Sequence, residues 1–269
     1  MNLVGLHIKN FDCFEAALKS AKLSNLNIFQ TFFINKIGNN KIEFDANFRN
    51  NFLKNYKPKF DKIFIHAPYI INLTYGYYST QPVLKHELRR MRDLELRDII
   101  FHCGGLYDNS VEKSANNVSR LLNYISKNNP NLIFYLENTA FGKNSFASNL
   151  EDFNLVYRNL DYPEKVKICI DTAHAYSFGY EINDNFIELL KTLPENSIKL
   201  IHLNDSGSEL GEKIDTHAEI GAGKIGIENL RRFIQNEFLK DIPVILELPD
   251  VEHNQEILQL DTVKSWVNY

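Results

Sequence analysis

Eight short runs of β-forming residues alternate with stretches of helical periodicity from one end of the chain to the other. The runs are rich in Ile, Val, Phe and Tyr, as strands are, and they cover residues 3–8, 28–33, 62–66, 99–102, 132–137, 166–171, 199–203 and 243–247. Eight strand–helix units in about 250 residues match the size of a (β/α)8 barrel. The sequence therefore predicts an α/β protein, a TIM barrel.

No Pro/Gly/Ser-rich linker interrupts this alternation, so we expect a single domain over residues 1–269. The first residues lack the pattern of a signal peptide, and no apolar run approaches the roughly 20 residues of a membrane helix. Cys13, Cys103 and Cys169 are odd in number and far apart, which is typical of free buried thiols in a reducing compartment. The expectation is an intracellular protein that is neither secreted nor bound to a membrane.

The formal net charge of −4 argues against a protein that holds nucleic acid by bulk positive charge. One basic cluster stands out in this acidic chain, formed by Arg89, Arg90, Arg92 and Arg97. On the outer helix of a barrel, such a cluster is typical of a solvated face.

The predicted strands end on residues that bind metals. Histidine or carboxylate side chains close or nearly close the third to eighth runs, and these are His66, His102, Glu137, Asp171, His202 and Glu247. All carboxyl ends of a parallel barrel open on one face, where barrel active sites are built. Three further groups follow strands six and seven, namely His174, Asp215 and His217.

Each of these nine groups alone has an ordinary structural explanation, such as a hydrogen-bonded buried side chain. Asp171, for example, would cap the helix on which His174 lies. Together, however, five imidazoles and four carboxylates at one mouth require cations among them. Nitrogen and oxygen donors without thiolates suit zinc, manganese or iron, and imidazole-rich sets favour zinc. Nine donors indicate more than one ion.

Six segments within this framework form a specific motif set, which is HAPYIINL, LENTA, IDTAHAYSFGY, HLNDS, DTHAEIGAG and ILELP. In order and spacing they resemble the motifs of endonuclease IV, the zinc-dependent apurinic/apyrimidinic (AP) endonucleases of base-excision repair. The resemblance runs from about Gly5 to Pro249. All nine metal-ligand positions of that family hold the expected residue type.

The resemblance implies three zinc ions, with manganese or iron as alternatives at some positions. His66 and His102 would hold the first ion, and Glu137 would bridge it to the second. Asp171, His202 and Glu247 would complete the second ion. His174, Asp215 and His217 would hold the third.

The implied reaction is hydrolysis of the phosphodiester 5′ to an abasic site by a zinc-bound hydroxide, with Glu137, Glu247 and Asp171 as the catalytic residues. The products would be a 3′-hydroxyl and a 5′-deoxyribose phosphate. The substrate would be double-stranded DNA, and the enzyme would act as a monomer without a protein partner. Bound divalent ions would offset the acidic net charge at the mouth.

Tyr69 and Ile70 fall where this family inserts side chains into DNA at the missing base, which suits wedge residues in kinked duplexes. Lys36-Ile37-Gly38 departs from the basic and aromatic segment common in the family after strand two.

The glycines of 221–226 fit the approach of backbone N–H groups to a DNA phosphate better than a dinucleotide site. His7 would face the pocket from strand one, whereas His86 and His253 would lie on surface helices.

Two other functions remain open. A xylose-isomerase-like sugar isomerase or epimerase uses a Glu, Asp, His, Glu set, which Glu137, Asp171, His202 and Glu247 satisfy. That reading leaves His66, His102, Asp215 and His217 unexplained. A non-catalytic binder of abasic lesions is the second alternative, and it would require a lost or blocked ligand.

Overall fold

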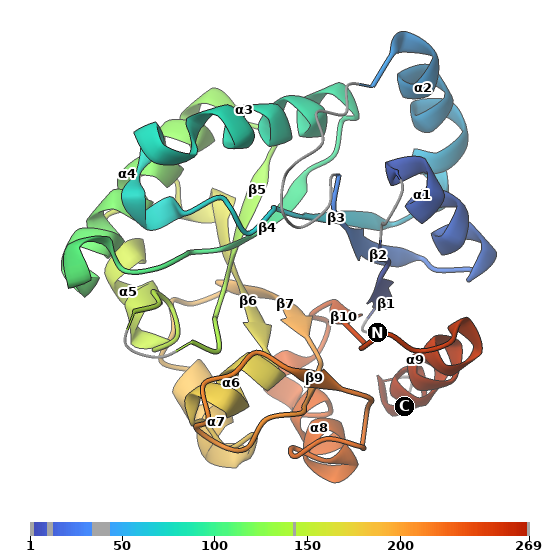
Figure 1. The fold of residues 1–269 in the computed structure, drawn as a ribbon, viewed down its shortest axis with the longest axis vertical. Coiled ribbons are helices and arrows are strands. Elements are labelled where there is room, and N and C mark those ends of the chain that lie inside the picture. Colours follow the sequence, from blue (N-terminus) through green and yellow to red (C-terminus); the bar gives the residue numbers. More distant parts are fainter. Residues whose placement is uncertain (1–2, 10–12, 34–43, 142–143, 268–269) are drawn as a thin grey trace.

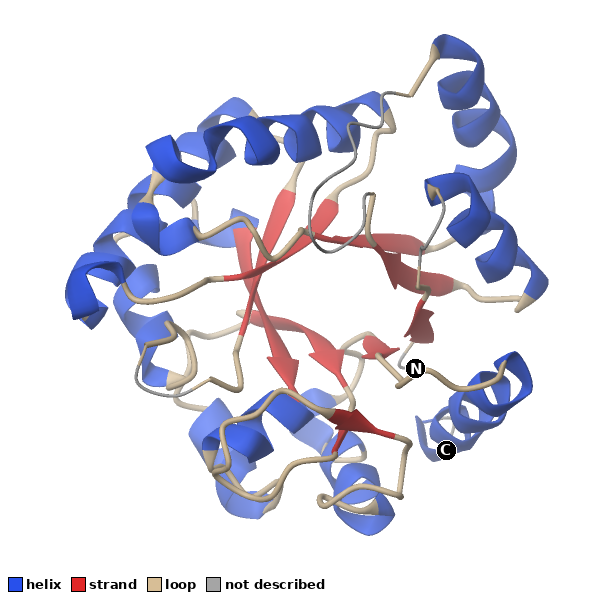
Figure 2. Ribbon diagram, in the orientation of Figure 1, coloured by secondary structure: helices blue, strands red, loops and turns tan. Residues whose placement is uncertain are grey.

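The chain folds into one closed barrel of eight parallel strands surrounded by helices (Figures 1 and 2). The structure is a computed structural model that describes residues 3–9, 13–33, 44–141 and 144–267. Around the barrel the strand order is β1-β10-β7-β6-β5-β4-β3-β2. The strands are β1 (Val4–His7), β2 (Ile28–Thr31), β3 (Lys62–His66), β4 (Asp98–His102), β5 (Ile133–Glu137), β6 (Val166–Asp171), β7 (Ile198–His202) and β10 (Val244–Leu246).

The predicted barrel is thus confirmed, and each of the eight predicted runs overlaps one strand, although β4 and β7 begin one residue before their predicted runs. Differences occur at the ends. β2 stops at Thr31, two residues before the predicted end, and β10 stops at Leu246, just before Glu247. A short antiparallel pair that was not predicted, β8 (Asp205–Ser206) and β9 (His217–Ala218), lies in the loop after β7.

Helices follow the strands and cover the outside of the barrel (Figure 2). They are α1 (Phe14–Leu23), α2 (Ala46–Asn51), α3 (Tyr77–Asp93), α4 (Val111–Asn128), α5 (Glu151–Tyr157), α6 (Thr172–Phe178), α7 (Asp184–Leu190), α8 (Ile227–Ile234) and α9 (His253–Val267). Several begin at a polar side chain that accepts a hydrogen bond from the first turn, such as Asp45 for α2, Ser110 for α4 and Asn183 for α7. Such caps satisfy amide groups that have no partner within the helix.

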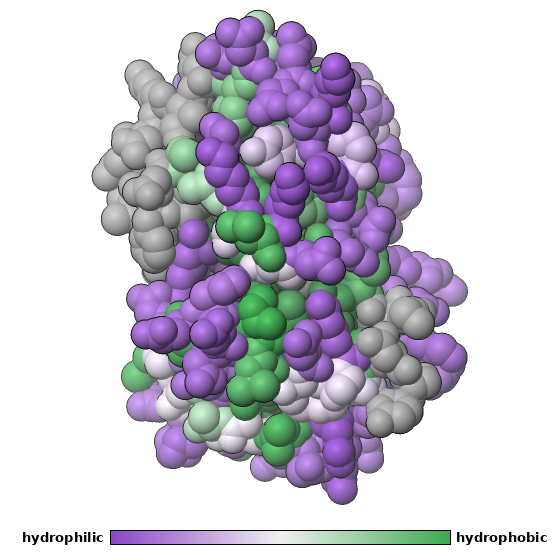
Figure 3. Space-filling model, turned by 90° about the vertical axis from the view of Figure 1, so that its right-hand side faces the viewer, coloured by the Kyte–Doolittle hydropathy of each residue, from purple (hydrophilic) through white to green (hydrophobic). Residues whose placement is uncertain are grey.

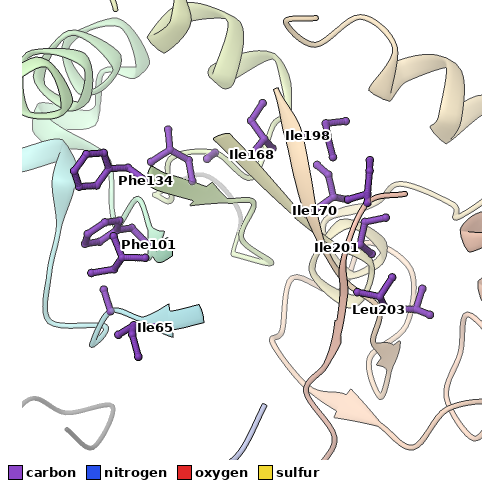
Figure 4. Packing of buried hydrophobic residues seen from close by; sticks show 14 of the residues in the cluster. Ile65, Phe101, Phe134, Ile168, Ile170, Ile198, Ile201 and Leu203 are labelled. Atoms are coloured by element: carbon purple, nitrogen blue, oxygen red, sulfur yellow. The ribbon is translucent and has the colours of Figure 1, made fainter. Parts of the chain in front are cut away.

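Two layers of apolar side chains lie on opposite faces of the barrel wall, because successive residues of a strand point to opposite faces. The larger layer fills the space between strands and helices, and Figure 4 shows members of it such as Ile65, Phe101 and Phe134. The smaller layer lies inside the barrel. Seven strands each contribute one member to it, which are Ile28, Phe64, Ile100, Tyr135, Cys169, Leu200 and Ile245. The barrel interior below the mouth is therefore a packed core.

The surface agrees only in part with the sequence-based expectations. Seen from the side on which α1, α2 and α9 lie, it is mostly hydrophilic with a central strip of hydrophobic side chains (Figure 3). Arg90 was expected on a solvated face, which is wrong, because it is buried and donates to Glu87 at 2.6 Å.

Cys103 and Cys169 are buried free thiols as expected, whereas Cys13, just before α1, is exposed. Within the described residues, no helix combines the length and apolar character needed to cross a membrane.

Gly5 allows the close approach of β1 and β2. A Cβ atom at this position would lie 2.1 Å from the carbonyl oxygen of Ile28. We expect Gly5→Ala to lower the free energy of unfolding by about 3 kcal/mol or more, because the backbone of β2 must move. Urea denaturation followed by circular dichroism measures this change. The control is Leu23→Ala, at the end of α1, where the side chain is 84% exposed. Equal midpoints for Gly5→Ala and wild type would contradict the close-approach argument.

Candidate metal centre at the barrel mouth

A ring of polar side chains lies directly above the inner apolar layer, at the carboxyl ends of the strands. Seven of its eight members follow a residue of the inner apolar layer by two positions, since side chains alternate along a strand, and His7 follows Gly5 in the same way. The members are His7, Gln30, His66, His102, Glu137, Asp171, His202 and Glu247. The strand geometry therefore delivers polar groups from all eight strands to one mouth.

Three more candidate ligands come from segments that cross the mouth. His174 lies in the first turn of α6, His217 begins β9, and Asp215 lies two residues before it. The chain after His217 is held by buried Asp205, whose carboxylate accepts hydrogen bonds from the backbone amides of Gly221, Gly223, Ile225 and Gly226. Those amides are therefore not available to a DNA phosphate, and the prediction made for the glycines of 221–226 is wrong.

Eight of the nine predicted ligands lie together in three overlapping groups at the mouth. One group is His66, His102 and Glu137, and a second is Glu137, Asp171, His202 and Glu247. These two match the sets that the resemblance implied. The third group combines His174 and His217 with Asp171. Asp215 adjoins it, because its Oδ1 lies 3.1 Å from His174 Nε2 and 3.4 Å from His217 Nε2.

Glu137 occupies the centre of the arrangement and is fully buried. Its Oε2 lies 3.1 Å from His66 Nε2 and 3.2 Å from His102 Nε2, whereas its Oε1 lies 3.0 Å from His202 Nδ1. Burial alone would raise the pKa of this carboxyl, but the charges of His202 and His102 hold it well below its usual value. A carboxylate with one oxygen in each of two groups is suited to bridge two cations.

The outer nitrogen of several imidazoles is held by a backbone carbonyl. The Nδ1 atoms of His66, His174 and His217 lie 2.8, 2.9 and 2.9 Å from the carbonyl oxygens of Ala67, Asn138 and Glu247, respectively. Such contacts fix the tautomer that leaves Nε2 as the inward donor atom, as is usual for metal-binding histidines.

His217 Nε2 is the most informative of these inward nitrogens. It is buried and finds no hydrogen-bond partner among the described residues. An unpartnered buried polar atom is costly, and a cation between this nitrogen and the Asp171 and Asp215 carboxylates, 3.8 and 3.4 Å away, would satisfy it. The donor set therefore fits metal ions.

Asp171 both caps helix α6 and faces the candidate metal ligands, the two roles that the sequence left open. Its Oδ1 accepts a 2.8 Å hydrogen bond from the backbone N–H of His174 and caps α6. Its Oδ2 faces the metal groups and accepts a 2.6 Å bond from the Asn204 side chain. The side-chain amide of Asn138 holds the backbone of Asp171. It accepts a hydrogen bond from the N–H of Asp171 and donates one to its carbonyl oxygen. One carboxylate thus joins the helix cap to the centre.

Thiolates do not take part in the centre. Cys169 belongs to the inner apolar layer, two residues before Asp171. Burial raises the pKa of its thiol to about 12, so it stays protonated near neutral pH. The donors are accordingly nitrogen and oxygen only, the set that suits zinc and related borderline ions.

Tyr69 and Ile70 lie at the rim, in the loop after β3. The ring of Tyr69 is half-exposed and stacks on His102, with centroids 4.8 Å apart. It also meets His66 edge-on at 5.5 Å. Ile70 is 59% exposed. Lys36, Ile37 and Gly38 lie outside the described residues, so the departure noted for that segment stays untested.

Sequence reasoning missed Gln30, Asn138 and Asn204, which hold the candidate ligands without being typical ligands themselves. The two-residue period of β2 signals Gln30, because it follows inward-pointing Ile28 just as His66 follows Phe64. His7 faces the mouth as expected, 3.2 Å from Glu247. His253 is exposed at the start of α9, and His86 is partly exposed on α3.

Comparisons with known proteins agree with this architecture. A family model described as xylose isomerase-like TIM barrel matches residues 34–265. A probable endonuclease 4 of Thermosipho melanesiensis is 33% identical over 73% of each chain. A probable endonuclease 4 of Mesoplasma florum is 34% identical over 76% of this chain and 72% of the relative. The crystal structure of endonuclease IV from Thermus thermophilus superposes with a TM-score of 0.81 at 23% identity, over 98% of both chains.

Metal binding should displace protons from His174 and His202. Burial lowers the pKa of His174, but Asp171 and Asp215 outweigh it and raise the pKa well above its usual value. The pKa of His202 is likewise raised well above its usual value, because the carboxylates of Glu247 and Glu137 outweigh burial. Below these raised pKa values the metal-free imidazoles carry protons that compete with metal. Zinc affinity should therefore fall as pH decreases from about 8 to about 6, with proton release near pH 7.

Isothermal titration calorimetry of zinc into metal-free protein, in two buffers with different ionisation enthalpies, measures the number of protons released. We expect the observed enthalpy to differ between the buffers in proportion to that number. The same enthalpy in both buffers would mean that the two imidazoles bind metal without losing protons, which contradicts the raised pKa values.

Proposed function

This chain belongs to the endonuclease IV family, within the xylose isomerase-like TIM barrels, and we propose that it is an AP endonuclease of DNA repair. The reaction is hydrolysis of the phosphodiester bond on the 5′ side of an abasic site in double-stranded DNA. It leaves a 3′-hydroxyl and a 5′-deoxyribose phosphate. The arrangement of three donor groups at one mouth carries this proposal, because a sugar isomerase requires only one of them.

The nine donors divide among three ions, for which we propose zinc, with manganese or iron as alternatives at some positions. His66, His102 and Glu137 hold the first ion. Glu137 also serves the second, together with Asp171, His202 and Glu247. His174, Asp215 and His217 hold the third, and the 3.1 and 3.4 Å contacts of Asp215 with the two imidazoles support this set.

Divalent ions held by these residues would lower the pKa of a bound water and would neutralise the charge that develops on phosphoryl oxygens. The protein orients them through its own side chains. Glu137, Asp171 and Glu247 supply the carboxylates, and hydrogen bonds from Asn204 and Gln30 hold the latter two in place. Fixed donors avoid reorganisation during the reaction, which is the main source of electrostatic catalysis.

DNA would approach the mouth past Tyr69 and Ile70. Ile70, 59% exposed, is free to wedge into a gap between base pairs. Tyr69 stacks on His102, so its ring forms a wall beside the first ion. Binding through ions at the mouth also accommodates the net charge of −4, since bound cations dominate the local potential.

The alternatives fit the site less well. A sugar isomerase would use the group of Glu137, Asp171, His202 and Glu247 and leave five further donors without a role. A lesion binder without activity would show a missing or blocked ligand. Every one of the nine positions carries a ligand type, and His217 Nε2 is left unpartnered within the described residues.

A duplex with one tetrahydrofuran abasic analogue tests the proposed activity. The analogue cannot undergo β-elimination, so cleavage must be hydrolytic. We expect zinc-loaded protein to cut it once, leaving a 3′-hydroxyl, and a chelator to abolish the cut. Glu247→Gln should reduce turnover by roughly 100-fold or more while leaving the circular dichroism spectrum unchanged, since one ligand of the second ion is lost. An intact duplex after incubation with zinc-loaded wild type would rule out the proposal.

The rim residues make a separate prediction about lesion recognition. Ile70→Ala should weaken discrimination between abasic and intact duplex by about 10-fold, because the wedge is lost. Tyr69→Ala should weaken it as well and also alter the environment of His102. Competition binding of the two duplexes to zinc-loaded protein measures the ratio. Leu210→Ala, at another partly exposed loop position, is the control. Unchanged ratios for both rim variants would contradict the proposed insertion.

A further inference from the structure

Gln30 is a fully buried amide in the polar ring, on β2, and it contacts three other members of that ring. Its Oε1 lies 2.8 Å from His202 Nε2. Its Nε2 lies 2.7 Å from His7 Nδ1 and also donates to Glu247 Oε1. Two N–H groups and one carbonyl oxygen of the amide are therefore all used, and the three partners come from β1, β7 and the residue after β10.

The carboxylate of Glu247 determines which way this amide points. An ionised carboxylate only accepts hydrogen bonds, so the nitrogen of Gln30 must face it. The reversed amide would place its oxygen against the carboxylate oxygen. With the nitrogen toward Glu247, the amide oxygen faces His202 Nε2, and that nitrogen must carry the hydrogen.

The tautomer of His202 follows from this orientation. With Nε2–H donated to Gln30, Nδ1 is the atom left for a metal. Nδ1 also faces the centre, 3.0 Å from Glu137 Oε1, 3.6 Å from Glu247 Oε2 and 3.9 Å from Asp171 Oδ2. His202 thus differs from His66, His174 and His217, whose outer nitrogens are Nδ1 atoms held by backbone carbonyls. At His202 the outer nitrogen is Nε2, and a side-chain amide takes the place of the carbonyl.

We propose that Gln30 is a positioning residue for the second metal ion, because its one amide fixes both the tautomer of His202 and the orientation of the Glu247 carboxylate. This inference rests on the proposed function to the extent that the group of Glu137, Asp171, His202 and Glu247 holds a metal. His7 completes the arrangement by accepting the second N–H of the amide. The amide then cannot rotate without losing all three contacts.

The first test needs no substitution. Nitrogen-15 histidine spectra of the zinc-loaded wild type identify which ring nitrogen of His202 binds the ion. We expect Nδ1 to be bound and Nε2 to keep a proton that exchanges slowly with solvent. Coordination of His202 through Nε2 would overturn the proposal, whatever the behaviour of any variant.

The second test replaces Gln30 by a side chain of similar length that has no amide. In Gln30→Met, we expect one zinc equivalent to bind about 10- to 100-fold more weakly than in wild type, as is usual when a group that orients a ligand is lost. The slowly exchanging His202 proton should also disappear. Thr31→Val is the matched control on the same buried strand, since it removes the 2.9 Å bond to the Ile8 carbonyl without touching the ring.

The outcomes separate this inference from the proposed function. Zinc affinity in Gln30→Met equal to that of wild type, or an equal loss in Thr31→Val, overturns the role of Gln30 and leaves the endonuclease proposal standing. Wild-type protein that binds no zinc removes the metal centre itself and with it both proposals. Selective weakening in Gln30→Met, with the His202 spectrum changed, supports the positioning role.

Discussion

The two-residue period of side chains along eight parallel strands is the constraint on which this molecule depends. Because all strands run in the same direction, each inward-pointing residue of a strand lies closer to the same open face than the one before it. One inward-pointing position places Phe64, Ile100 and their counterparts in a packed layer. Two residues later the next one places His66, His102 and their counterparts in a polar ring. The apolar layer closes the bottom of the site, and the side chains of the ring supply the nitrogen and oxygen atoms that face it.

A buried polar ring is stable only if its outer atoms find partners. Backbone carbonyls bond three imidazoles, and Gln30 bonds a fourth. Asn204 and Asn138 hold Asp171, and five backbone amides surround the carboxylate of Asp205. The site is therefore oriented from outside by groups that do not themselves face the centre. This division leaves the inward atoms to face one another across the mouth, where cations would bind between them.

Much of the fold was readable from the sequence because strand and helix periods are local properties. The nine candidate ligands, which the structure brings together, could be predicted because histidines and carboxylates at successive strand ends are rare as a set. Gln30 escaped notice because an amide is not a typical metal ligand. The segment 221–226 was misread because its amides bind Asp205, a partner distant in sequence that spacing alone does not reveal. Arg90 was misplaced for a similar reason, since its burial depends on how α3 packs.

The distribution of donors over the strands also bears on how such a site arises in evolution. Glu137, Asp171, His202 and Glu247 come from β5, β6 and β7 and from the end of β10, which are neighbours in the barrel. One half of the mouth thus contains a complete group of four candidate ligands by itself. The donors of β3, β4, α6 and the β9 segment surround it without sharing its strands. A barrel with only these four candidate ligands would need no different backbone, so the other candidate ligands could be gained or lost by exchanging side chains one strand at a time.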